Sequence, residues 1–278
     1  METNILKAIC NLTKIKNNDL KNIYKGSNRA NIVGEALEYY IKDLFCDSFG
    51  AKDINKKDKA YSKYFSYICN QNNPPDFIIS EGDALEVNKT KGTEGIVLNS
   101  PYPKSKLYTE SPMITQACRD CEEWQAKDLI YSIGTVLSGK LKLLWMIYGD
   151  CFVADKDIYK GIRNKISGDM NELSDMELSD AGPSTVDPLG ITRFSLRSSC
   201  TVDNPVKIFD YAVPINQNIK FSVKAILSED KYLSFPKEDR LKIESITNKN
   251  FAINNIKIKS PDNPAKLMRA KLLSLEVA

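Results

Sequence analysis

The sequence predicts a mixed α/β fold, with a mixed central β-sheet flanked by helices and a β-rich C-terminal part. Three observations support this prediction. Helical periodicity dominates residues 1–48, short strand-like segments fill the middle of the chain, and further strand-like segments follow an acidic stretch. The chain has 278 residues, of which 42% are hydrophobic and 27% are charged, so it contains enough apolar material for one large core or two modest ones.

Two amphipathic helices are expected near the N-terminus. Apolar side chains recur at helical spacing over residues 4–15, and the same pattern is stronger over residues 31–49. The second of these helices is therefore predicted to be a core element. Residues 51–63 are rich in Lys and Asp and are expected to form a solvated loop or the end of a helix.

The middle of the chain is expected to supply the central sheet. Residues 77–79 and 84–88 are short apolar segments separated by the turn residues Glu81, Gly82 and Asp83, which predicts a β-hairpin. Two longer apolar segments then indicate central strands. The remaining predicted elements are a strand at 96–98, helices at 114–124 and 155–166, and the two central strands at 129–137 and 141–153.

An acidic segment divides the chain. Residues 168–190 contain Gly, Ser, Pro and six acidic residues with almost no periodic apolar pattern, which predicts a loop or linker. We therefore expect either three parts, at 1–167, 168–190 and 191–278, or one domain that includes all of them. The elements predicted beyond this segment are strands at 191–196, 206–211 and 221–227 and a closing amphipathic helix at 261–278.

The most informative feature of the composition is the absence of histidine. It excludes Ser-His and Cys-His nucleophile pairs, His-ligated zinc sites and nucleases that use a histidine base. Chemistry based on carboxylate, lysine, tyrosine or thiol groups remains. The formal net charge is only +3, so any basic surface for a polyanion must be local. Seven irregularly spaced cysteines favour a reducing cytoplasm, and no segment reaches the length of a membrane span.

Two carboxylates carry the predicted chemistry. Asp76 leads into the first strand of the hairpin, and Glu86 lies ten residues later on the second strand. Because side chains alternate along a strand, Glu86 and Asn88 share one face, while Leu85 and Val87 anchor the opposite face in the core. If the hairpin pairs as expected, Asp76 approaches Glu86. Two carboxylates then provide an all-oxygen site of the kind that Mg²⁺ prefers.

Such a site can hydrolyse a phosphodiester without histidine, because the metal lowers the pKa of a bound water and offsets charge on the phosphoryl oxygens. A third carboxylate from a nearby helix often completes it. Glu38 lies at the edge of the apolar stripe of the helix at 31–49, whereas Glu35 falls nearly opposite, so Glu38 is the better candidate. The alternative is that Asp76 and Glu86 form a structural pair, since an Asp after a proline and a Glu on a strand are both common.

These residues carry a family resemblance. Pro75-Asp76 followed by Glu86-Val87-Asn88 resembles the PD-(D/E)XK nuclease signature, except at its last position. Three further blocks look like the NgoPII family of type II restriction endonucleases, and several spaced blocks in one order are more specific than the short motif. The blocks are residues 28–38, 72–76 and 99–107, within a similarity that extends from about residue 28 to residue 209.

The resemblance implies a PD-(D/E)XK nuclease core at 1–167, with the catalytic hairpin at 75–89. It implies a Mg²⁺-dependent homodimer that cuts duplex DNA at a short palindrome, with GGCC the site associated with the family. Asp76 and Glu86 are the implied metal ligands. A cognate DNA methyltransferase would act on the same site without direct contact. The expected location is the cytoplasm of a prokaryotic cell.

One position departs from the family pattern. The lysine expected two residues after the glutamate is replaced by Asn88, and Lys89 follows it. On a regular strand Lys89 points away from Glu86, so it can serve only if a bulge changes its direction. Asn88 can orient a water by hydrogen bonding but supplies no positive charge.

Four basic residues are expected to contact DNA. Lys104 and Lys106 lie in a proline-containing loop and are predicted phosphate partners. Arg193 and Arg197 follow the acidic segment and are predicted to recognise guanine through bidentate hydrogen bonds to O6 and N7. A palindrome of G·C pairs would need such contacts from each subunit of a dimer.

Three alternative functions stay open at this point. Asn88 motivates a DNA-binding protein that has lost catalysis, and a repair or recombination nuclease on the same core is a further alternative. Residues 134–140 match the spacing of a phosphate-binding loop, which would indicate a P-loop NTPase. However, Leu141 takes the place of the Ser or Thr that binds Mg²⁺, so a β-turn is the favoured interpretation.

Cys118 and Cys121 form a lone CxxC pair and are expected to be packing residues.

Overall fold

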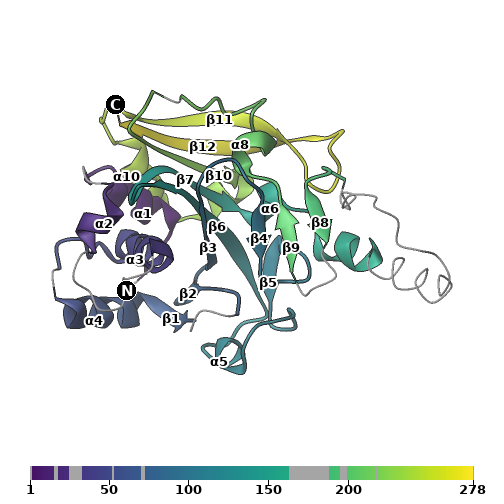
Figure 1. The fold of residues 1–278 in the computed structure, drawn as a ribbon, viewed down its shortest axis with the longest axis horizontal. Helices are drawn as coiled ribbons and strands as arrows, with labels where there is room; N and C mark the ends of the chain where they lie inside the picture. Colours follow the sequence, from purple (N-terminus) through teal and green to yellow (C-terminus); the bar gives the residue numbers. More distant parts are fainter. Residues whose placement is uncertain are drawn as a thin grey trace.

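A large mixed β-sheet forms the centre of the molecule (Figure 1). The computed structural model describes residues 2–15, 18–24, 33–51, 53–69, 73–162, 188–194, 199–216 and 218–277. The main sheet has the strand order β1-β2-β3-β6-β7-β10-β12-β11, and β5 pairs with β6 beside this path. A smaller sheet has the order β4-β9-β8. The predicted fold class, a mixed sheet with flanking helices, is confirmed.

The strands and helices have the following bounds. The strands are β1 (Phe65–Ile68), β2 (Phe77–Ile79), β3 (Ala84–Thr90), β4 (Ile96–Leu98), β5 (Lys106–Tyr108), β6 (Ala126–Leu137), β7 (Lys140–Tyr148), β8 (Thr192–Phe194), β9 (Cys200–Val202), β10 (Phe221–Ser228), β11 (Phe251–Lys259) and β12 (Leu267–Val277). The helices are α1 (Ile5–Leu12), α2 (Leu20–Ile23), α3 (Val33–Cys46), α4 (Ile54–Tyr64), α5 (Gln116–Arg119), α6 (Gly149–Phe152), α8 (Pro205–Ile208), α9 (Glu229–Ser234) and α10 (Lys237–Glu244). Residues 156–162 are also helical. Within the described ranges, no helix combines the length and apolar character that a membrane crossing requires.

Parallel and antiparallel pairs alternate in the centre of the sheet, from β3 to β10. β3 runs parallel to β6, β6 and β7 form an antiparallel hairpin, and β7 runs parallel to β10. The C-terminal strands β12 and β11 then add antiparallel pairs. Strands from the predicted parts 1–167 and 191–278 therefore hydrogen-bond within one sheet. Of the predicted acidic linker at 168–190, only residues 188–190 are among the described residues.

The central strands are buried on both faces, which explains their unbroken apolar sequences. Ile130 of β6 and Leu144 of β7 belong to a core shared with α1 and α3. Their neighbours Tyr131 and Trp145 belong to a second core, which includes side chains from β4 and β9. In Figure 1 the N-terminal helices and the small sheet accordingly lie on opposite sides of the main sheet. The prediction of two central strands is confirmed, except that the second strand ends at Tyr148 and residues 149–152 form helix α6 instead of continuing the strand to 153.

A buried carboxylate fixes helix α3 in place. Asp43 is fully buried, and its oxygens accept hydrogen bonds from the hydroxyls of Tyr24, Ser48 and Tyr61. The same carboxylate pairs with the ammonium of Lys57 on α4. A buried charge with this many partners is stable, whereas removal of its partners would leave it uncompensated. These contacts hold α3 against α4 and against the end of α2, which helps to position the side chains of α3.

Several predicted elements were wrong, because long-range pairing prevails over local preference. Residues 51–63 mostly belong to helix α4, and residues 206–211 begin inside helix α8 instead of forming a strand. The expected closing helix at 261–278 is replaced by strand β12, which lies between β10 and β11 and pairs with both. The predicted helix at 114–124 is reduced to the single turn of α5.

Candidate active site

The predicted hairpin is confirmed and brings Asp76 to Glu86. β2 and β3 pair antiparallel, and the backbone N–H of Asp76 donates to the carbonyl of Leu85 at 3.0 Å. One carboxylate oxygen of Asp76 accepts a hydrogen bond of 2.5 Å from the backbone N–H of Val87. The Asp76 carboxylate therefore binds the backbone of β3 one residue before β2 begins. The residue that it binds, Val87, is the direct neighbour of Glu86.

The two carboxylates share an electrostatic environment that raises both pKa values. Burial raises the pKa of Asp76 well above its usual value, and the negative charges of Glu86 and Glu38 raise it further. Burial also raises the pKa of Glu86 to about 7, although the nearby ammonium of Lys104 lowers it and Glu38 raises it. Three acidic groups that repel one another in this way would all be stabilised by a bound cation.

The donor set fits Mg²⁺. Asp76 and Glu86 supply hard carboxylate oxygens, and Mg²⁺ is usually held by one or two carboxylates together with waters and substrate phosphate. Within the described part of the chain, no group of three or more His, Cys, Asp or Glu side chains could hold a metal ion. The protein would therefore provide two ligands, and Glu38 acts on them through its charge.

Lys42 is a site residue that the sequence analysis missed. It lies on α3 one helical turn after Glu38, it is buried, and its Nζ is 4.3 Å from the centre of the Tyr39 ring. Burial lowers the pKa of Lys42, while the charges of Glu38 and Asp76 raise it. The i to i+4 spacing from Glu38, which places both side chains on one helix face, was the signal that could have revealed it.

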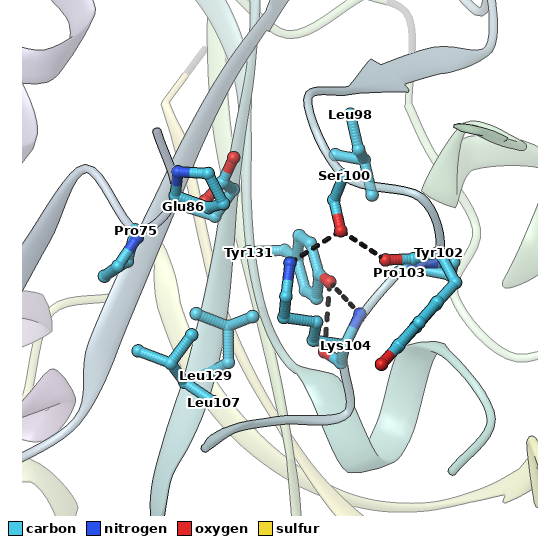
Figure 2. A pocket seen from close by; sticks show the side chains of 11 residues that line it. Pro75, Glu86, Leu98, Ser100, Tyr102, Pro103, Lys104, Leu107, Leu129 and Tyr131 are labelled. Carbon is cyan, nitrogen blue, oxygen red and sulfur yellow. Dashed lines mark hydrogen bonds between the residues drawn. The ribbon is translucent and has the colours of Figure 1, made fainter. Parts of the chain in front are cut away.

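A small pocket beside Glu86 contains a second buried lysine (Figure 2). Lys104 is 4% exposed, and its Nζ donates a hydrogen bond of 2.6 Å to Oγ of Ser100. The backbone N–H of Lys104 donates to the hydroxyl of Tyr131 at 2.8 Å, and that hydroxyl donates to the Lys104 carbonyl at 3.0 Å. Burial lowers the pKa of Lys104, and the Glu86 carboxylate raises it. The predicted phosphate contact is therefore enclosed in the protein next to the acids.

Asn88 and Lys89 lie as strand alternation predicts. β3 pairs with β6 in unbroken register from Ala84 to Thr90, so no bulge redirects Lys89. Lys89 is exposed. The Nδ2 group of Asn88 is buried and has no hydrogen-bond partner within the described residues. A buried donor of this kind is costly unless water or a ligand satisfies it, so Asn88 has a group available on the face that carries Glu86.

Of the other predicted DNA contacts, the side chain of Lys106 is described. The Lys106 side chain is 47% exposed and forms an ion pair of 3.0 Å with Asp128. The side chain of Arg193 and the whole of Arg197 lie outside the described residues.

The segment at 134–140 connects β6 and β7 through a tight turn, in which Ser138 and Gly139 have positive φ. The β-turn interpretation is confirmed.

Comparisons with known proteins show the family to which the chain belongs. A family model described as NgoPII restriction endonuclease matches residues 3–259. The type II restriction enzyme NgoPII of Neisseria gonorrhoeae is 39% identical over 277 residues, which cover 98% of this chain and 99% of that protein. No solved structure matches the chain. Fold, site and relatives thus define a type II restriction endonuclease. Within this class, the chain belongs to the NgoPII restriction endonuclease family.

Proposed function

We propose that the protein hydrolyses phosphodiester bonds of double-stranded DNA at a short palindrome, for which the family implies GGCC, with Mg²⁺ as the cofactor. The observation that carries this proposal is the meeting of Asp76, which directly precedes β2, with Glu86 on β3, where both pKa values are raised. This arrangement supports a nuclease site of the PD-(D/E)XK type.

Asp76 and Glu86 would hold the cation. When bound, Mg²⁺ lowers the pKa of a coordinated water and offsets negative charge on the phosphoryl oxygens. Glu38 adds negative charge that strengthens cation binding, and Lys42 limits the repulsion between Glu38 and Asp76 in the metal-free protein. The unpaired Nδ2 group of Asn88 can donate a hydrogen bond to a water or to a phosphate oxygen on the same strand face.

DNA binding is proposed to use a dimer. A palindromic site has twofold symmetry, so a homodimer with one reaction centre for each strand matches it. Lys106 is the exposed candidate for a phosphate contact, and Arg193 and Arg197 remain the candidates for guanine recognition. A cognate methyltransferase that modifies the same site would protect the host DNA without contact between the two proteins.

Incubation of the wild-type protein with a plasmid of known sequence and Mg²⁺ tests this proposal. We expect discrete fragments whose ends map to one short palindrome. Glu86→Gln should reduce the cleavage rate by at least about a thousandfold while specific DNA binding persists, because the amide cannot act as an anionic metal ligand. Glu123→Gln is a matched control, since Glu123 is exposed and lies on another segment.

Three other outcomes would contradict the proposal or change it. Specific binding without any cleavage would favour a DNA-binding protein that has lost catalysis, which Asn88 alone would suggest. Cutting that depends on branched DNA structure instead of sequence would indicate a repair or recombination nuclease. If Glu86→Gln lost its fold together with binding, Glu86 would be a structural carboxylate.

A further inference from the structure

The candidate site lacks an obvious positive charge on the strand that carries its acids. A neutral Asn88 stands on the same face as Glu86, and Lys89 is exposed on the opposite side of an unbroken strand. A phosphodiester gains negative charge on its phosphoryl oxygens as it is hydrolysed, so a fixed positive charge close to those oxygens lowers the barrier. Another segment of the chain must supply this charge if the protein itself provides it.

Two buried lysines lie near the acids, and their surroundings differ. Lys42 lies on α3 over the Tyr39 ring, near Glu38 and Asp76. Lys104 lines the same pocket as Glu86, and its ammonium donates a hydrogen bond to the hydroxyl of Ser100. Glu86 is the carboxylate that Lys104 interacts with in this pocket, whereas Lys42 interacts with both Glu38 and Asp76, so the ammonium of Lys104 is shared among fewer acids.

The fold holds Lys104 opposite Glu86. Tyr131 is the direct partner of Glu86 in the pairing of β3 with β6, and its hydroxyl makes two hydrogen bonds with the backbone of residue 104. Figure 2 shows Lys104 and Glu86 lining this pocket from two separate segments, the loop before β5 and strand β3. The pocket has a free volume of about 10 Å³, which is on the scale that one water molecule needs.

We propose that Lys104 is a catalytic residue: beside Glu86 its ammonium orients the attacking water and stabilises the negative charge that develops on the phosphoryl group, a charge that the neutral Asn88 cannot offset. This inference rests on the proposed nuclease function. In the reaction a water oxygen forms a bond to phosphorus while the bond from phosphorus to the leaving sugar oxygen breaks. The water loses a proton to solvent, and the leaving oxygen gains one. Lys104 neither gains nor loses a proton; it stabilises the negative charge and orients the water.

Single-turnover cleavage of duplex DNA by Lys104→Met tests the inference. We expect the rate to fall by about a hundredfold or more, as for the loss of one group that stabilises transition-state charge. Binding of the same DNA, measured with Ca²⁺ in place of Mg²⁺, should stay within about threefold of wild type, because a buried lysine contributes little to the DNA backbone contact. Lys104→Gln keeps a donor for Ser100 and provides the test if the Met variant does not fold.

Lys224→Met is the matched control, because Lys224 is another buried lysine, paired with Glu276 on β12. Its cleavage rate should equal that of the wild type. A folded Lys104 variant that cleaves within about threefold of wild type would overturn the inference. Loss of DNA affinity in parallel with the rate would also overturn it, since Lys104 would then be a backbone contact. A wild-type protein that cuts no DNA would instead refute the proposed function, and this inference with it.

Discussion

At the scale of single residues, the carboxylates of Asp76, Glu86 and Glu38 repel one another in the metal-free protein. The pKa of Glu86 is raised to about 7, whereas a glutamate in the unfolded chain titrates at its ordinary value of about 4.3. Between these two values the folded protein holds a proton that the unfolded chain has lost. The free energy of unfolding therefore falls as the pH rises through this window, and the penalty is complete above about pH 7.

Glu86→Gln should remove this penalty. Without metal, we expect the variant to be more stable than wild type by about 1–3 kcal/mol near pH 8, and the difference should shrink toward zero near pH 5. Urea denaturation at several pH values measures it. Glu123→Gln should show no such pH-dependent difference. A wild-type protein that is as stable as Glu86→Gln at the higher pH would mean that Glu86 is not raised in pKa.

At the scale of elements, the junction of β7 and α6 supports the segment that carries Lys104. A Cβ atom added at Gly149 would collide with the carbonyl oxygen of Ser105 and lie 2.8 Å from that of Lys104. Both obstacles are backbone atoms, so the segment must move as a unit. Glycine is required here by close approach, and the shape of this junction is part of the site.

Gly149→Ala is expected to destabilise the fold by about 1–3 kcal/mol, as other overpacked sites do. We also expect cleavage to slow by about tenfold or more, because catalysis is sensitive to displacements of about 1 Å. Urea denaturation and single-turnover cleavage measure the two effects. Gly161→Ala provides the control, since a Cβ added there meets no other described residue within 4 Å and the position is helical. If both alanine variants behaved alike, the close approach at Gly149 would have no consequence.

At the scale of the whole molecule, one sheet links the hairpin of β2 and β3 to the C-terminal strands. β3 connects through β6 and β7 to β10, so residues separated by about half of the chain lie in one sheet. If the protein cuts a palindrome as proposed, two copies of the chain act together on one DNA site. Sedimentation of the DNA-bound protein should then give twice the chain mass of 31.3 kDa, plus the DNA. A single chain that cuts both strands at concentrations where it remains a monomer would contradict the dimer.

The local chemistry of the site could be predicted from the sequence. A turn between two short apolar segments specifies the hairpin, and the period-two alternation of β3 places Glu86 and Asn88 together and Lys89 apart from them. Helical periodicity also selected Glu38, which interacts electrostatically with both acids. These features depend on residues that are near one another in the chain, where backbone geometry alone decides which side chains share a face.

Only the tertiary structure decided the rest. The Leu-rich segment at 267–277 has a composition that favours a helix, yet it is a strand because β10 and β11 offer hydrogen bonds on both of its edges. Lys104 looked like a surface contact in a loop, but Tyr131 and Ser100 enclose it next to Glu86. Periodicity and turn chemistry describe neighbours along the chain. Burial and strand pairing across the whole sheet decide which distant segments meet. Local sequence patterns therefore do not predict these contacts.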